Sequence, residues 1–149
     1  MSKQSYFFPV LSDSFDRLAP LALPALRVTI GIILMAHGYG KFNAAFFGDG
    51  IGGLSGFIAS KGLPAPELLA WLTIVTEFGG GICIFFGLFT RLFAAMATIM
   101  MLVVVLVFKD VGVFKGGYEY ELLIAVCCLV FAVRGAEGCS IDAKLKTTF

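Results

Sequence analysis

The sequence predicts an all-α membrane protein, a bundle of four transmembrane helices with an amphipathic loop segment on its outer face. Of its 149 residues, 59% are hydrophobic and only 14% are charged, whereas soluble domains are roughly 45–50% apolar and about 25% charged. The apolar residues also form long continuous blocks, which indicate helices and not the alternating strands of membrane barrels. The net charge of +1 excludes a nucleic-acid-binding protein that works through a basic face.

Four apolar segments are long enough to cross a bilayer, since a helical crossing needs about 20 mostly apolar residues. We expect these spans at about residues 21–42, 68–88, 92–108 and 117–133. Pro64 and Pro66 introduce the second span, because proline suits the first turn of a helix. Residues 1–149 then form one membrane domain, with an interfacial N-terminal segment at 1–20 and a polar tail at 134–149.

The N-terminal segment mixes charged and aromatic residues and lacks the apolar core of a signal peptide. We expect it to lie on the lipid headgroups through its large apolar side chains, which are Phe7, Phe8, Val10, Leu11, Phe15 and Leu18.

An even number of spans places both termini on one side of the membrane. That side carries six basic residues, Lys3, Arg17, Arg91, Arg134, Lys144 and Lys146, and the other side carries four, Lys41, Lys61, Lys109 and Lys115. This bias favours cytoplasmic termini, and the opposite orientation stays open. The longest connection, residues 43–63, is rich in glycine and aromatic residues and is expected at the outer surface. Within it we expect a short amphipathic helix at 54–60 that acts as a lid over the bundle.

Ionisable side chains inside apolar spans are costly, so each one is a candidate functional residue. In the first span, Arg27, His37 and Lys41 fall within one arc of a helix and share that face with Gly31, Leu34 and Gly38. This polar, glycine-lined face is therefore expected to point into the bundle.

The second and fourth spans supply acidic partners for this face. Glu77 lies near the middle of the second span, beside a run of glycines that allows close helix packing. Glu119 and Glu121 begin the fourth span. We expect His37 and Lys41 to face Glu119 or Glu121, with Glu77 deeper and Arg27 below it.

Purely structural roles remain open for several of these charges. Arg27 and Glu77 can pair only to fix the helix register, and Lys41 and Glu121 lie near span ends, where snorkelling to water is expected. His37 stands apart as the single histidine, because imidazole titrates near neutral pH and suits proton handling or ligand binding. One histidine cannot supply both axial ligands of a haem, and no metal-ligand spacing occurs. We therefore expect no haem or metal in this chain.

The order of several short motifs resembles the DoxX family of small four-helix membrane proteins, over residues 26–142. The motifs are Leu26-Arg27, His37-Gly38-Tyr39-Gly40-Lys41-Phe42, Gly62-Leu63-Pro64, Glu77-Phe78-Gly79-Gly80-Gly81, Gly87-Leu88-Phe89-Thr90-Arg91, Gly117-Tyr118-Glu119-Tyr120 and Gly138-Cys139-Ser140-Ile141-Asp142. The resemblance implies a location in the plasma (inner) membrane of a prokaryote. It also implies a membrane part of a quinone-linked oxidoreductase or a protein tied to oxidative stress. It marks as candidate site residues Arg27, His37, Lys41, Glu77 and Glu119.

The resulting hypothesis is a redox-linked membrane subunit that binds a quinone headgroup and works with a partner oxidoreductase. In it His37 and Glu77 are catalytic, because His37 donates to a quinone carbonyl and Glu77 relays protons. Lys41 favours the reduced form, Glu119 orients His37, and Arg27 completes the ligand-binding set. Two alternatives stay open: a non-enzymatic membrane scaffold or anchor for a soluble enzyme, and a small transporter, which would require a homodimer.

Overall fold

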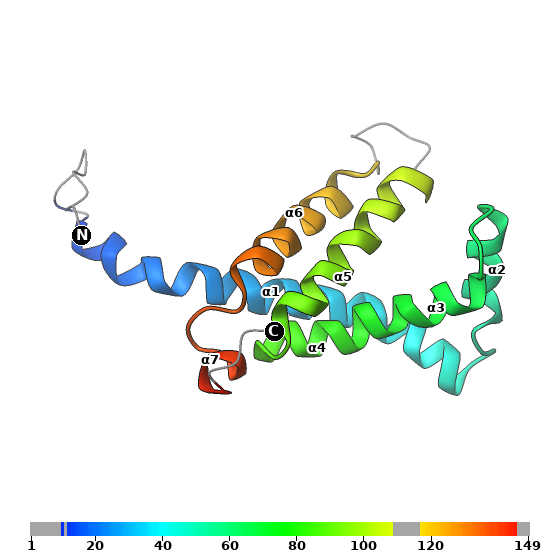
Figure 1. Ribbon diagram of the computed structural model, residues 1–149, viewed down its shortest axis with the longest axis horizontal. Coiled ribbons are helices and arrows are strands. Elements are labelled where there is room, and N and C mark those ends of the chain that lie inside the picture. Colours follow the sequence, from blue (N-terminus) through cyan, green and yellow to red (C-terminus); the bar gives the residue numbers. More distant parts are fainter. Residues whose placement is uncertain (1–9, 11, 109–116, 146–149) are drawn as a thin grey trace.

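The computed structural model describes residues 10, 12–108 and 117–145, and these form helices and no strand (Figure 1). The helices are α1 (Ser12–Phe47), α2 (Gly52–Ser60), α3 (Pro66–Ile74), α4 (Gly80–Phe86), α5 (Thr90–Val103), α6 (Glu119–Arg134) and α7 (Ile141–Leu145). Two π-helical turns, η2 (Val75–Gly79) and η3 (Val104–Phe108), continue α3 and α5 without a break. The all-helical prediction is thereby confirmed for the described residues.

Among these residues, three helical segments are long and apolar enough to cross a membrane. They are Ser12–Phe47, Pro66–Phe86 and Thr90–Phe108, and they contain the first three expected spans except for the last residues of the second. The fourth expected span corresponds to α6, which has 16 residues. At 1.5 Å per residue α6 is about 24 Å long, shorter than a hydrocarbon core of about 30 Å. The expected number of four spans is therefore not confirmed.

Helix α1 extends beyond both ends of the expected first span at 21–42. It has 36 residues and runs through Pro20 and Pro24, which transmembrane helices tolerate better than helices in water do. The expected interfacial segment is consequently continuous with α1 from Ser12 onward, with Phe15 and Leu18 exposed. Of the apolar residues assigned to that segment, Phe7, Phe8 and Leu11 lie outside the described residues.

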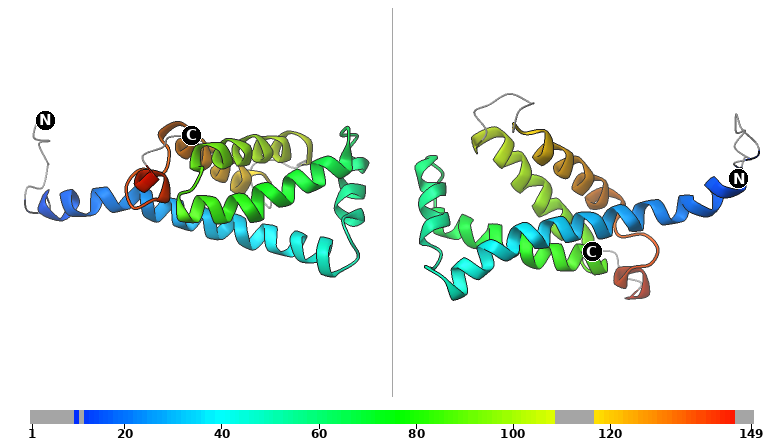
Figure 2. Two further views of the ribbon diagram at one scale, coloured as in Figure 1. Left: turned by 60° about the horizontal axis from the view of Figure 1, so that its bottom comes forward. Right: turned by 180° about the vertical axis from the view of Figure 1, so that it is seen from behind.

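Two helical pairs make up the fold. Helix α1 packs along α3–η2–α4, and α5 packs along α6 (Figures 1 and 2). The pairs cross near the α4–α5 connection, and α5 diverges from α3 toward the end that carries α2 (Figure 1). The crossing buries an apolar core of Ile30, Leu34, Ile84, Ala94, Ala97, Met101, Ile124, Ala125, Cys128 and Phe131.

Glycines allow α1 to approach its neighbour closely. A Cβ atom on Gly38 would lie 2.3 Å from the backbone nitrogen of Phe78, and one on Gly31 would lie 2.8 Å from the Phe85 backbone. Gly31, Leu34 and Gly38 are all buried, so this part of the expected interior face is confirmed. The close approach fixes η2, and with it Glu77, directly against α1.

The polar tail folds back onto the start of α5. The Asp142 carboxylate accepts hydrogen bonds from the backbone N–H groups of Phe89 (2.9 Å) and Thr90 (3.0 Å). The N–H of Asp142 in turn donates to the Gly87 carbonyl oxygen at 2.8 Å. Asp142 thus satisfies donors that the first turn of a helix otherwise leaves unpaired.

Candidate functional site

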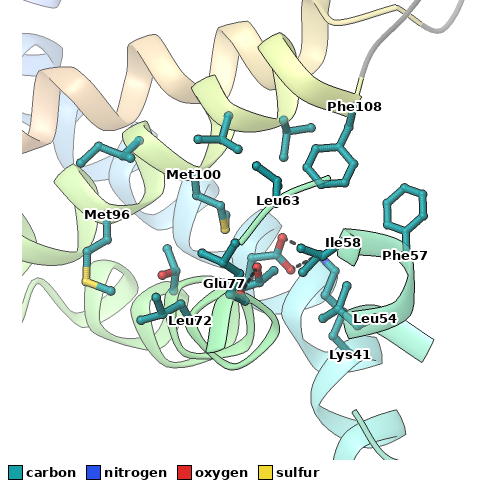
Figure 3. A pocket seen from close by; sticks show the side chains of 16 residues that line it. Lys41, Leu54, Phe57, Ile58, Leu63, Leu72, Glu77, Met96, Met100 and Phe108 are labelled. Carbon is teal, nitrogen blue, oxygen red and sulfur yellow. Dashed lines mark hydrogen bonds and ion pairs between the residues drawn. The ribbon is translucent and has the colours of Figure 1, made fainter. Parts of the chain in front are cut away.

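An ion pair joins α1 to the π-helical turn η2. The Lys41 ammonium donates to both carboxylate oxygens of Glu77 (Figure 3). The Glu77 side chain is only 6% exposed and the Lys41 side chain is 33% exposed. A carboxylate this deeply buried requires a partner, and Lys41 supplies both a neutralising charge and hydrogen bonds.

The pair lines a largely apolar cavity of about 610 Å³, a volume in the usual range for a small-molecule site, with Met96 on one side of the pair and Phe57 on the other (Figure 3). Four of the 16 lining residues have polar side chains, namely Lys41, Thr73, Thr76 and Glu77. The remaining lining residues are aliphatic, aromatic or methionine side chains, among them Leu72, Met96, Met100 and Phe108 (Figure 3). The cavity is therefore suited to a largely apolar ligand that carries a polar group to meet the ion pair.

Three helical segments form most of the cavity wall, and Lys41 of α1 and Leu63 complete it. One is a single face of α3 and η2, which presents Leu69, Leu72, Thr73, Thr76 and Glu77 at the spacing of a helix. Opposite it stands α5 with η3, which contributes Met96, Ile99, Met100, Val103, Val104 and Phe108. Helix α2 adds Leu54, Phe57 and Ile58.

Helix α2 occupies the position expected of the lid. The sequence predicted a short helix at 54–60, and the structure places it at Gly52–Ser60. The Phe57 ring lies 5.2 Å from the Phe108 ring across the cavity wall (Figure 3). The α2 helix is thereby connected to the end of the third membrane-spanning helix through an aromatic contact.

The π-helical geometry occurs at Glu77 itself. Segment Val75–Gly79 interrupts an otherwise α-helical span, and single π-helical turns inside helices are frequent at functional sites. On its other side, the backbone of Glu77 and Phe78 faces Gly38. The ionisable group therefore lies on a locally irregular segment that α1 holds in place.

The ion pair corrects the expected constellation. Lys41 was expected to face Glu119 or Glu121, or to snorkel to water, with Glu77 deeper in the membrane. The structure instead pairs Lys41 with Glu77, because the close Gly38 contact brings η2 against the last turns of α1.

His37 lies apart from the cavity. It is exposed, its Nδ1 atom is 3.0 Å from the Ile33 carbonyl oxygen of its own helix, and its ring stacks on Tyr120 at 5.7 Å between centroids. Among the described residues, Glu119 makes no hydrogen bond to His37. Glu119 itself is exposed at the start of α6. The roles assigned to His37 and Glu119 from the sequence therefore stay predictions.

Arg27 lies at the other end of the bundle, against the tail. It is 3% exposed, and its Nη2 atom donates to the Cys139 carbonyl oxygen at 2.8 Å. Its Nε and Nη1 atoms have no hydrogen-bond partner among the described residues. Arg27 is thus part of the bundle interior, as expected, but does not line the cavity with Lys41 and Glu77.

Sequence reasoning missed Thr76 and the methionine-rich wall opposite it. Thr76, Glu77 and Thr73 recur at helical spacing in the second span, so the polar face was detectable from the sequence. Met96 and Met100 lie one turn apart on α5, and no sequence pattern distinguishes them from lipid-facing residues. Only the divergence of α5 from α3 turns them toward a cavity (Figure 3).

Comparisons with known proteins add to this geometry. A family model described as DoxX matches residues 22–110. The chain is 30% identical over 117 residues to the Bacillus subtilis (strain 168) protein named "Putative oxidoreductase CatD", which covers 78% of this chain and 81% of that protein. It is 28% identical over 133 residues to "Inner membrane protein YqjF" of Escherichia coli (strain K12), covering 87% of this chain and 96% of that protein. No solved structure matches.

Proposed function

The chain belongs to the DoxX family of membrane proteins, and from this we propose that it is a redox-linked subunit that binds a quinone-type headgroup beside Lys41 and Glu77. The observation that carries the proposal is the Lys41–Glu77 ion pair in the wall of a largely apolar cavity. A membrane quinone has the matching form, a polar ring with two carbonyl oxygens on an apolar tail. The Bacillus subtilis relative, which is named as an oxidoreductase, supports the same class of activity.

Lys41 and Glu77 divide the polar recognition between them. The Lys41 ammonium can donate a hydrogen bond to a carbonyl oxygen, and it stabilises negative charge that develops there. The Glu77 carboxylate can accept a hydrogen bond from a ring hydroxyl and hold its proton. A bound quinone supplies reversible two-electron, two-proton chemistry, and the electrons come from a partner oxidoreductase.

The apolar walls would hold the remainder of the ligand. Met96 and Met100 are flexible, polarisable side chains that adapt to irregular ligand surfaces. They stand across the cavity from Leu72 and Glu77 (Figure 3). Exclusion of water by these walls strengthens the electrostatic interactions of the ion pair with the headgroup.

The proposal includes a topology in the bilayer. Helix α6 packs along α5 and serves as the fourth span, with local thinning of the bilayer around its 16 residues. Both termini then lie in the cytoplasm, as the distribution of lysine and arginine favours. Accessibility of single introduced cysteines to a membrane-impermeant maleimide in right-side-out vesicles tests this: a cysteine at position 144 should stay unlabelled, and labelling would reverse the topology.

Extraction of the purified protein, followed by chromatography and mass spectrometry, tests for a bound quinone. The unsubstituted protein should carry close to one quinone per chain, and Glu77→Gln and Lys41→Met should lose most of it. Glu67→Gln is the matched control, since Glu67 is an exposed residue in the first turn of α3. It should retain the quinone.

Two other results would point elsewhere. A protein that carries no quinone in any preparation contradicts the proposal and favours the anchor for a soluble enzyme, which affinity capture from solubilised membranes would then identify. Substrate uptake into proteoliposomes without a partner protein would favour the transporter instead.

A further inference from the structure

We propose that Thr76 is a specificity-determining residue of the cavity, and that its hydroxyl favours quinone rings that carry an ether oxygen beside a carbonyl group. The inference rests on the proposed function, because it takes a quinone-type ring as the ligand. It goes further by distinguishing two ring classes, alkoxy-substituted benzoquinones and alkyl naphthoquinones.

Two threonines lie on the same wall of the cavity. Thr73 and Thr76 lie one turn apart in the second membrane-spanning helix, and both line the cavity. The Thr73 hydroxyl donates to the Leu69 carbonyl oxygen of its own helix at 2.8 Å, as threonine commonly does in helices. Thr76, by contrast, makes no hydrogen bond to any residue that the structure describes.

Burial makes this difference significant. Thr76 is only 3% exposed as a residue, but its hydroxyl is not among the fully enclosed side-chain atoms that lack a partner, so the hydroxyl opens onto the cavity that Thr76 lines. A ligand that fills the cavity displaces water from this hydroxyl, and a hydroxyl left without a hydrogen-bond partner costs free energy. A ligand oxygen placed beside Thr76 would accept that missing hydrogen bond, whereas a ring C–H group in the same place would leave the hydroxyl unsatisfied. Sites that contain such a buried polar group discriminate against ligands unable to pair with it.

The ion pair cannot provide this discrimination. Lys41 and Glu77 interact with carbonyl and hydroxyl oxygens, which every quinone carries in one redox state or the other. Thr76 directly precedes Glu77 in η2 and both side chains line the same cavity, so a ring bound beside the ion pair can present a second oxygen to the Thr76 hydroxyl. In an alkoxy-substituted benzoquinone that oxygen is present next to the carbonyl, and in a naphthoquinone the second ring replaces it.

Binding of two short-tailed probes to the full chain in detergent tests the inference by isothermal titration. The probes are a dimethoxy benzoquinone and a methyl naphthoquinone, each with one isoprenoid unit. Thr76→Val keeps the side-chain shape and should weaken binding of the dimethoxy probe about fivefold. The same variant should leave binding of the naphthoquinone within about twofold. Thr29→Val is the matched control, because the exposed Thr29 hydroxyl donates to the Ala25 carbonyl oxygen of its own helix and Thr29 does not line the cavity; it should leave both affinities within about twofold.

Each outcome then decides a separate question. Equal effects of Thr76→Val on the two probes, or no effect on either, would overturn the role of Thr76 while binding by the unsubstituted chain leaves the proposed function intact. Binding of neither probe by the unsubstituted chain would overturn both. If Thr76→Val does not fold, Thr76→Ser and Thr76→Ala replace it: the serine variant should keep the preference and the alanine variant should lose it, and identical preferences in the two would contradict the inference.

Discussion

Helix α1 carries one basic side chain toward each end of the packed bundle, Arg27 and Lys41, and their surroundings differ. Lys41 forms an ion pair with Glu77, and both groups line a cavity of about 610 Å³. Arg27 donates to the Cys139 carbonyl oxygen of the tail. Its guanidinium packs so closely against Gly87 that a Cβ atom there would lie 1.9 Å from Nη1. The Lys41 end therefore has room for a ligand, whereas protein atoms fill the space at the Arg27 end.

This difference shows why burial of a charge does not by itself identify a functional site. Arg27 is the more deeply buried of the two basic residues, yet its contacts tie the tail to the bundle. The Lys41 and Glu77 side chains both line the largely apolar cavity, and the Lys41 side chain is 33% exposed. We expect substitutions at the Arg27 end to change stability and those at the Lys41 end to change ligand binding, and the predictions below test that division.

The largest effect is expected for Gly87→Ala. A Cβ atom there would lie 1.9 Å from Arg27 Nη1 and 2.5 Å from Ser140 Cβ, on a backbone with a φ of +69°. Because the Ser140 Cβ atom is fixed to the tail backbone and a φ of +69° strains any residue with a side chain, the free energy of unfolding should fall by about 3 kcal/mol. Thermal unfolding in detergent measures the loss. Gly40→Ala, with no atom within 4 Å of its added Cβ, is the control, and equal melting temperatures for the two would contradict the packing described here.

The ion pair should show an intermediate effect on stability. Lys41→Met leaves the Glu77 carboxylate without its partner and should cost about 2 kcal/mol, between the values typical of exposed and buried pairs. Lys41→Met combined with Glu77→Gln removes both charges, so it should recover most of that stability without recovering bound quinone. Denaturant titration and lipid extraction measure the two properties. Additive losses of stability would show that the two side chains are not coupled.

A smaller effect is expected for Asp142→Ala. This substitution removes the acceptor of the Phe89 and Thr90 N–H groups and should cost about 1 kcal/mol, as the loss of a helix cap does. The bound quinone should remain, since Asp142 lies at the end of the bundle away from the cavity. Loss of quinone from a folded Asp142→Ala protein would contradict the separation of the two ends.

His37→Ala should have the smallest effect on stability, less than about 0.5 kcal/mol, because the side chain is exposed. The variant should also keep its quinone, since His37 does not line the cavity. If His37 handles protons as predicted from the sequence, quinone-linked turnover with the partner oxidoreductase will fall while expression and bound quinone stay unchanged. Loss of the quinone itself would instead place His37 at the headgroup.

Much of the fold could be predicted from local patterns in the sequence. Long apolar blocks predicted the first three spans, and helical spacing predicted the buried face with Gly31, Leu34 and Gly38. The partner of Lys41 was mispredicted because it depends on the register between α1 and η2, which the Gly38 contact fixes in three dimensions. Docking of the tail through Asp142 was missed for a related reason: its polar residues have no periodicity, and their partners are more than 50 positions away in the chain.

The most direct test of the central claim is photolabelling with an azido-quinone that carries a short isoprenoid tail. After irradiation of the protein in membranes, digestion and mass spectrometry locate the modified residues. We expect labelling on the α3–η2 segment and on α5 around Met96 and Met100. Excess unlabelled quinone should suppress this labelling, and so should the Glu77→Gln substitution. Labelling confined to α6 or the tail, or labelling that excess quinone does not suppress, would contradict the claim.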